Sequence, residues 1–169
     1  MNSDAGARAR YEKRKRQRVY IYIDNIEPQS KKMPEAERDK FQEAVAEQLT
    51  TLKRTTFTGD VALKIDLATT SKNAPQAHTI AKNLLDLLGV RRSNVKWPRR
   101  HLLYKDDRQI QALSVSCSHG ETSPAISIGA QPFGSMLDDL ELATEARRSI
   151  EMSLSLIHIS EPTRLALIS

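Results

Sequence analysis

The sequence is poor in cysteine and aromatic residues, and it has no long apolar run. Cys117 is the single cysteine among 169 residues, so one chain cannot form a disulfide framework or a thiolate metal cluster. A chain without disulfides fits a reducing compartment. No run of about eighteen apolar residues is present that would cross a membrane, and no apolar segment follows the charged N-terminus as in a secretory signal. We therefore expect a cytoplasmic protein with no membrane partner, in a prokaryotic or phage-like context.

Basic residues, by contrast, are in excess, and the formal net charge is +5. A positive surface favours nucleic acid or an anionic membrane as partner; a soluble basic protein without such a partner is the alternative. The charge is densest in residues 1–18, where basic residues outnumber Asp4 and Glu12. This block predicts a flexible basic arm that binds polyanions or, alternatively, a solvated tail. Its candidate DNA-binding residues are Arg14, Lys15 and Arg16.

The final segment, residues 154–169, looks foreign to the rest of the chain. From Leu154 it reads Leu-Ser-Leu-Ile-His-Ile-Ser-Glu-Pro-Thr-Arg, which resembles the in-frame translation of a transposase-type sequencing adapter. We expect this segment to be a non-native tail and the natural sequence to differ after Ser153. The segment is therefore left out of the reasoning on the fold, and His158 is not considered as a ligand.

The hydrophobic pattern predicts strands and helices within one domain of residues 19–150. Runs of β-branched residues and strict alternation predict four strands, and apolar residues at helical spacing predict three helices. The expected strands cover residues 19–23, 61–67, 113–117 and 125–129, and the expected helices cover residues 34–53, 76–88 and 134–149. The order β-α-β-α-β-β-α, without an internal repeat or a Gly-rich phosphate loop, indicates an α+β fold.

Three polar residues of the second expected helix form the first candidate group. His78, Lys82 and Asp86 are four residues apart, so they lie along one ridge of the helix, opposite its leucines. Such a ridge is suited to contact a ligand. A plain solvated face with a weak Lys82–Asp86 ion pair explains the same spacing.

The second candidate group is the adjacent pair Asp106 and Asp107 at the entrance of the third expected strand. Adjacent carboxylates repel each other, and a bound divalent cation neutralises them. Their hard oxygens suit Mg²⁺ or Mn²⁺ better than Zn²⁺. A turn or a helix cap is the alternative role for such a pair.

Together these residues resemble the motifs of the RusA family of Holliday-junction resolvases. Lys82-x-x-x-Asp86-x-Leu88-Gly89 and Asp106-Asp107-Arg108-Gln109-Ile110 match the family motifs on a helix and at the start of a strand, and the region of resemblance spans about residues 57–130. The resemblance implies a mixed four-stranded sheet packed with two to three helices. It also implies a homodimer that hydrolyses phosphodiesters of branched DNA with Mg²⁺ or Mn²⁺.

The resemblance also implies roles for individual residues. Lys82 matches the lysine that balances charge at the phosphate, and Asp86 matches the helix aspartate. Asp106 and Asp107 match the acidic pair that holds metal, with Asp107 as its catalytic member.

The sequence departs from the family at the Asp-x-Asp-Asn motif. Gln76 and His78 stand where the family has two aspartates, and Thr79 stands where it has Asn. His78 then becomes an unusual candidate metal ligand and catalytic residue, while Asp66 and Asp86 are the candidates to replace a lost carboxylate. Because imidazole suits Mg²⁺ poorly, we expect weaker metal affinity, an altered metal preference or no catalysis.

A basic loop follows the second expected helix and interleaves cations with aromatic residues. This composition suits a DNA strand or an opened junction; a basic surface loop with Trp97 in the core is the alternative. Its candidate DNA-binding residues are Arg91, Arg92, Lys96, Trp97, Arg99, Arg100 and Lys105.

The sequence therefore predicts a RusA-like endonuclease that acts on branched DNA in recombination and repair. The alternative is a catalytically inactive, nuclease-derived DNA-binding protein, which the exchanges at Gln76 and His78 favour. A protein-interaction module with incidental basicity is the third interpretation.

Overall fold

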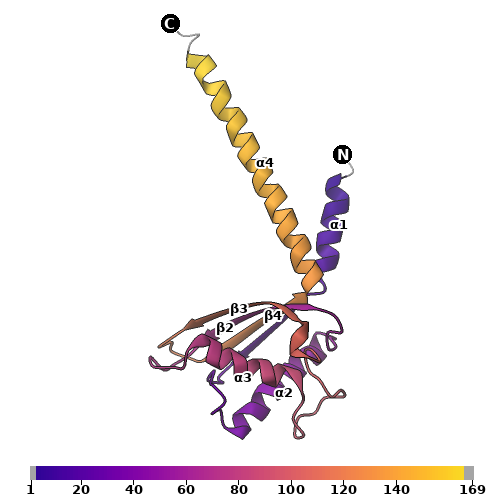
Figure 1. Ribbon diagram of the computed structural model, residues 1–169, viewed down its shortest axis with the longest axis vertical. Coiled ribbons are helices and arrows are strands. Elements are labelled where there is room, and N and C mark those ends of the chain that lie inside the picture. Colours follow the sequence, from indigo (N-terminus) through magenta and orange to yellow (C-terminus); the bar gives the residue numbers. More distant parts are fainter. Residues whose placement is uncertain (1–2, 166–169) are drawn as a thin grey trace. The chain divides into compact units, whose positions relative to one another are not determined.

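The computed structural model describes residues 3–165 (Figure 1), and the chain divides into two units, residues 1–134 and 135–169. The first unit contains a four-stranded sheet and three α-helices, and α4 forms the second. The elements are α1 (Ser3–Lys15), β1 (Val19–Asp24), α2 (Glu35–Thr51), β2 (Val61–Ala68), α3 (Ala77–Gly89), the 3-10 helix η1 (Asp107–Gln109), β3 (Ile110–Ser118), β4 (Ala125–Pro132) and α4 (Phe133–Leu165). Among the described residues, no helix is long and apolar enough to span a membrane.

The sheet is mixed, with the strand order β1-β4-β2-β3. β2 and β3 run parallel and are joined through α3, whereas β4 pairs antiparallel with both β1 and β2. The α+β class and the mixed four-stranded sheet are thus confirmed. The position of β4 between β1 and β2 leaves β1 and β3 as the two edge strands.

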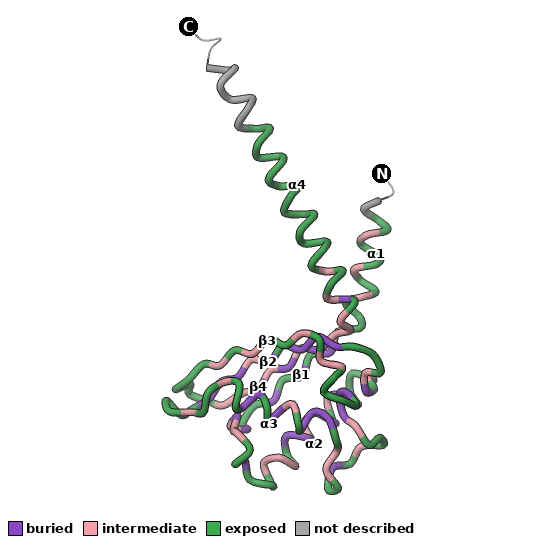
Figure 2. The backbone as a smooth tube through the Cα atoms, in the orientation of Figure 1, coloured by how far each residue is buried: buried purple, intermediate pink, exposed green. Residues whose placement is uncertain are grey.

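Helices α2 and α3 cover one face of the sheet (Figure 1). Residues of β1 alternate between buried and exposed, as expected for a strand with one face packed and one face open. Figure 2 shows buried residues along α2 and α3 as well as in the strands that they cover. The core is mostly aliphatic, and its fully buried members include Ile21, Phe41, Leu49, Ile65, Ile80, Leu84, Leu88, Tyr104, Ile126 and Ile128.

The structure differs from the sequence-based prediction at both ends. Within residues 1–18, where the sequence predicts a flexible basic arm, Ser3–Lys15 form α1, because the Ala, Arg, Lys and Glu residues of this segment have high helix propensity. The domain expected over residues 19–150 is divided at Gly134. The last helix, expected over residues 134–149, continues to Leu165.

Candidate functional site

Helix α3 presents the candidate ridge to solvent. Ile80, Leu84 and Leu88 are fully buried, and His78, Lys82 and Asp86 on the opposite side are exposed. The side chains of His78 and Lys82 make no hydrogen bond or ion pair with any of the residues that the structure describes. They are therefore available to a ligand.

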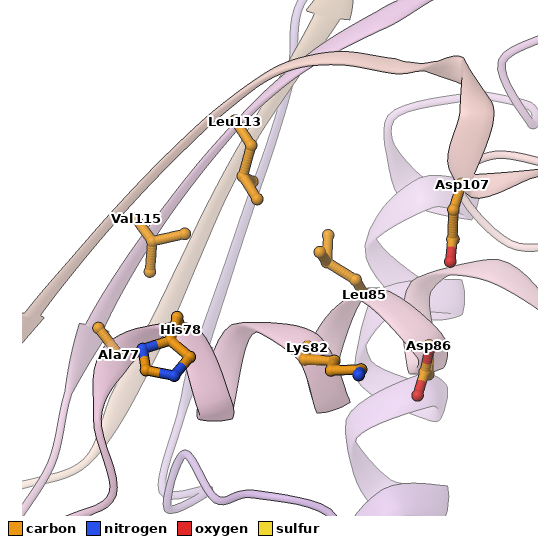
Figure 3. A pocket seen from close by; sticks show the side chains of 8 residues that line it. All are labelled: Ala77, His78, Lys82, Leu85, Asp86, Asp107, Leu113 and Val115. Atoms are coloured by element: carbon orange, nitrogen blue, oxygen red, sulfur yellow. The ribbon is translucent and has the colours of Figure 1, made fainter.

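A pocket of about 440 Å³ lies between α3 and the start of β3 (Figure 3). It brings three residues of α3 together with one residue that lies far along the sequence: His78, Lys82 and Asp86 with Asp107. The remaining lining residues are Ala77, Leu85, Leu113 and Val115. Because α3 runs antiparallel to the parallel strands that it joins, its C-terminal half lies beside the entrance of β3, where Asp107 is placed.

The two adjacent aspartates have different environments. Asp106 is the N-cap of η1: its Oδ1 accepts a hydrogen bond of 2.8 Å from the backbone N–H of Arg108. Asp107 instead lines the pocket and points from η1 toward α3 (Figure 3). The sequence left a cap role and a ligand role open for this pair. Asp106 has the cap role, and Asp107 is the candidate ligand.

The side chain of Gln109 holds this turn in place. Its Oε1 accepts hydrogen bonds from the backbone N–H groups of Lys105 at 2.8 Å and Asp106 at 3.1 Å. Its Nε2 donates to the backbone oxygens of Phe57 at 3.2 Å and Gly59 at 2.7 Å. All four partners belong to the backbone, so Gln109 ties the residues that precede Asp107 to the segment of residues 57–59.

The carboxylates create a negative potential at one end of the pocket. Tyr104 lies below it, fully buried, and its hydroxyl donates a 2.5 Å hydrogen bond to the backbone oxygen of Leu85. Burial strongly raises the pKa of Tyr104, and the negative charges of Asp107 and Asp86 raise it further. Both carboxylates therefore act on the same region, which a cation would neutralise.

The raised pKa of Tyr104 predicts a pH dependence of stability. The unfolded chain loses the tyrosine proton near pH 10.0, whereas the folded chain keeps it, so unfolding becomes more favourable as the pH rises above that value. Tyr104→Phe should cost about 1 kcal/mol below pH 10 through the lost hydrogen bond. Above pH 10 we expect the variant to lose stability less steeply than the unsubstituted protein. Urea unfolding at a series of pH values measures this, and parallel curves would contradict the prediction.

Asp66 does not contribute to this pocket. It lies on the opposite face of the sheet, where Ser116 donates a hydrogen bond to its carboxylate and Lys64 forms an ion pair of 3.1 Å with it. The hydrogen bond from Ser116 lowers the pKa of Asp66, and Lys64 adds to this effect. Of the two carboxylates considered as replacements for the family's aspartates, only Asp86 lines the pocket.

Part of the basic loop has a structural role. Arg91 donates hydrogen bonds to the backbone oxygens of Val95 and Arg99, and Arg92 pairs with Asp39 and Glu35 of α2. The indole of Trp97 packs against the core and donates to the backbone oxygen of His101 at 2.9 Å. These three side chains stabilise the loop, which favours the core alternative for Trp97.

The other predicted DNA-binding residues stay on the surface. The side chains of Lys96, Arg99, Arg100 and Lys105 are exposed, and none of them pairs with an acidic group in the part of the chain that the structure describes. On α1, Lys15 is exposed, as is Arg16 just after the helix, whereas Arg14 is half-buried. These exposed cations are the candidates for contacts with phosphates.

Geometry decides which residues could hold one metal ion. His78 and Asp86 are eight residues apart on α3, which separates their Cα atoms by about 12 Å at 1.5 Å per residue. Among the side chains that the structure describes, residues 5–157, no group of three His, Cys, Asp or Glu is arranged to bind a metal ion. Asp86 and Asp107, by contrast, supply two hard carboxylates, a number with which Mg²⁺ is bound when water and substrate phosphates complete its shell. The donor set thus fits a metal that binds together with a phosphate.

Fold and pocket together define an α+β protein with a mixed four-stranded sheet and a charged pocket beside its β3 edge. The chain matches no model of a known protein family and no curated protein. Sequence reasoning assigned no structural role to two residues that shape the site: Gln109, which belongs to the matched motif and supports the turn, and Tyr104, which is buried and bonded to the lining residue Leu85. In the sequence, the apolar residues next to Tyr104 indicated its burial. No sequence pattern indicated the four backbone contacts of Gln109.

Proposed function

We propose that the chain is a RusA-like, metal-dependent endonuclease that hydrolyses phosphodiesters in branched DNA during recombination and repair. The observation that carries this proposal is the pocket, which joins Lys82 and Asp86 of α3 to Asp107 at the entrance of β3. These are the residues that the motif resemblance marks, and they come from two separate parts of the sequence. A basic surface of exposed loop cations supports a nucleic-acid substrate.

Each residue of the pocket has a role in the proposal. Asp107 and Asp86 would hold Mg²⁺ or Mn²⁺, which supplies charge neutralisation at the phosphoryl group and an activated water. Lys82 lies on the same helix face as Asp86, one turn before it, and donates to a non-bridging phosphate oxygen. His78 lies about two turns before Asp86, one turn beyond Lys82 toward the N-terminus of α3. It contacts a neighbouring phosphate of the bound strand rather than the metal ion.

One existing contact must yield to the metal. Lys31 forms an ion pair of 3.2 Å with Asp86, and the side chains are 64% and 49% exposed. Exposed pairs of this kind contribute at most about 1 kcal/mol. Lys31 therefore pairs with Asp86 too weakly to prevent a divalent cation from replacing it.

The proposal is tested by incubating the full chain with a labelled synthetic four-way junction in Mg²⁺ and, separately, in Mn²⁺. We expect paired, symmetric nicks in the junction and no cleavage of a linear duplex of the same sequence. Symmetric nicks require two related sites, so a homodimer is part of the proposal, and sedimentation of the same preparation measures it. Equal cleavage of junction and duplex would contradict the preference for branched DNA.

A DNA-binding protein without catalytic activity is the second candidate. The observation that favours it is the donor set, since Gln76 is an exposed amide at the N-cap of α3 and the described residues offer no three-ligand cluster. Junction binding that weakens steeply with salt, without a cut in either metal, would support this candidate over the nuclease.

A further inference from the structure

The face of the sheet opposite α2 and α3 carries two exposed tyrosine rings. Tyr20 and Tyr22 lie on edge strand β1 and are 66% and 60% exposed. Their neighbours across the sheet are small or polar. Across β4, β2 and β3, the residues in register with Tyr20 are Gly129, Lys64 and Ser114. Those in register with Tyr22 are Ser127, Asp66 and Ser116. We call these eight residues the tyrosine face.

The ring of Tyr20 lies next to Gly129 of β4. A Cβ atom at this position would stand 3.5 Å from the Tyr20 ring and 3.8 Å from Cβ of Lys64. The ring of Tyr20 therefore lies over Gly129 of β4, which separates it from Lys64 of β2, and most of the side chain stays exposed. An aromatic plane beside a cation is the arrangement on which a nucleobase stacks.

The polar part of the tyrosine face argues against a protein partner with a dry interface. Ser116 donates to Asp66, and Lys64 pairs with the same carboxylate, so the centre of the face is hydrogen-bonded and charged. Stable protein interfaces have a core depleted in charged residues. The outer edge of β1 is also closed to a further strand at Tyr22, because Gln48 bonds to the backbone N–H and oxygen of that residue at 2.9 Å and 2.6 Å.

Positive charge borders the face on the side of the chain that enters β1. Arg18 immediately precedes β1, and its guanidinium donates a 3.1 Å hydrogen bond to Gln131 of β4. The same guanidinium lies over the ring of Tyr11, 5.6 Å from its centroid. The exposed cations Lys15 and Arg16 come just before it in the chain. Aromatic rings with adjacent cations match the bases and phosphates of one nucleic-acid strand.

We propose that the tyrosine face binds single-stranded nucleic acid by stacking bases on Tyr20 and Tyr22. Lys64, Arg18 and the cations that precede β1 contact its phosphates. The negative charge of Asp66 on β2 repels phosphates, although Lys64 partly balances it. We therefore expect phosphates to bind on the β1 side of the face. This site lies on the opposite side of the sheet from the pocket, and the inference does not depend on the pocket's proposed activity.

The test is fluorescence anisotropy of the full chain with a labelled oligothymidylate of about 12 nucleotides, a length within the range that one domain covers. The double substitution Tyr20→Ala/Tyr22→Ala should weaken binding by about tenfold or more for each ring. The matched control Tyr20→Phe/Tyr22→Phe keeps both rings and should bind within a few-fold of the unsubstituted chain. An abasic strand of the same length should bind all three proteins equally, because only phosphate contacts remain.

Other outcomes would overturn the proposal. Equal binding of the Ala and Phe variants to oligothymidylate would exclude stacking, and a monomer–dimer change in the Ala variant would show that a second copy covers the face. Thermal unfolding by circular dichroism checks that the variants fold, since exposed rings contribute little to the core. Asp107→Asn should leave this binding unchanged, so a failure of the pocket proposal and a failure of this one are distinguishable.

Discussion

Asp107→Asn is expected to lower junction cleavage by more than about 100-fold, while junction binding changes little. Substitutions that merely disturb the orientation of a metal ligand already cost about 10- to 100-fold, and this substitution removes a proposed ligand. Asp107 lines the pocket and is exposed, so an isosteric amide there leaves the fold intact. Cleavage assays in Mg²⁺ and Mn²⁺, with anisotropy of the same labelled junction, measure both quantities.

The neighbouring residue provides the matched control. Asp106 accepts the capping hydrogen bond from Arg108 and does not line the pocket. Because Asn caps helices about as well as Asp, Asp106→Asn should cleave within a few-fold of the unsubstituted chain. Equal and large losses in both variants would contradict the division of roles between the two aspartates. Unchanged cleavage in Asp107→Asn would contradict the pocket as the active site.

Gln42→Ala is expected to destabilise the protein by about 3 kcal/mol, the largest stability effect that we predict. Gln42 on α2 is fully buried, and its amide donates to the backbone oxygens of Leu87 at 2.7 Å and Val90 at 2.9 Å. Its Oε1 accepts from the backbone N–H of Arg92 at 2.8 Å. Alanine removes the partner of the buried Leu87 oxygen and of the part-buried groups of Val90 and Arg92, at a cost of about 1–3 kcal/mol for each group that water does not reach.

The measurement is thermal or urea unfolding, with Gln48→Ala as the control on the same helix. Gln48 also makes two hydrogen bonds to a backbone, that of Tyr22, but at the surface, where water replaces them. We expect a loss below about 1 kcal/mol for Gln48→Ala and a fall in Tm of roughly 6–12 °C for Gln42→Ala, at 2–4 °C per kcal/mol. Equal losses would show that burial does not set the difference.

The strands and the two helices of the core were predictable from the sequence because local periodicity reports burial. The alternation in β2 and the helical spacing of Ile80, Leu84 and Leu88 gave these elements within a few residues of their observed ends. The helical conformation of α1 was not predicted, since a basic composition indicates charge while α1 depends on helix propensity. The boundary at Gly134 had no signal, because contact density between distant segments is not a local property.

The candidate site was predictable only as a set of residue types. The ridge of His78, Lys82 and Asp86 followed from helical spacing, and the structure adds Asp107 to its pocket. The motif resemblance singled out Asp107 of the two adjacent aspartates, and Asp107 is the one that lines the pocket. Residue types alone left the choice open, because it depends on the turn that Gln109 holds. Helix geometry alone gives the separation of His78 and Asp86 along α3. This separation is too large for the imidazole and the Asp86 carboxylate to bind one ion.

By itself the sequence determined the aliphatic core, the identity of the charged ridge and the excess of cations, because these depend on composition and on spacing within single elements. Only the tertiary structure decided the strand order, the exclusion of Asp66 from the pocket and the structural use of Arg91, Arg92 and Trp97. Each of these depends on which segments meet across the sheet. Such contacts join residues distant in sequence, so no local pattern records them.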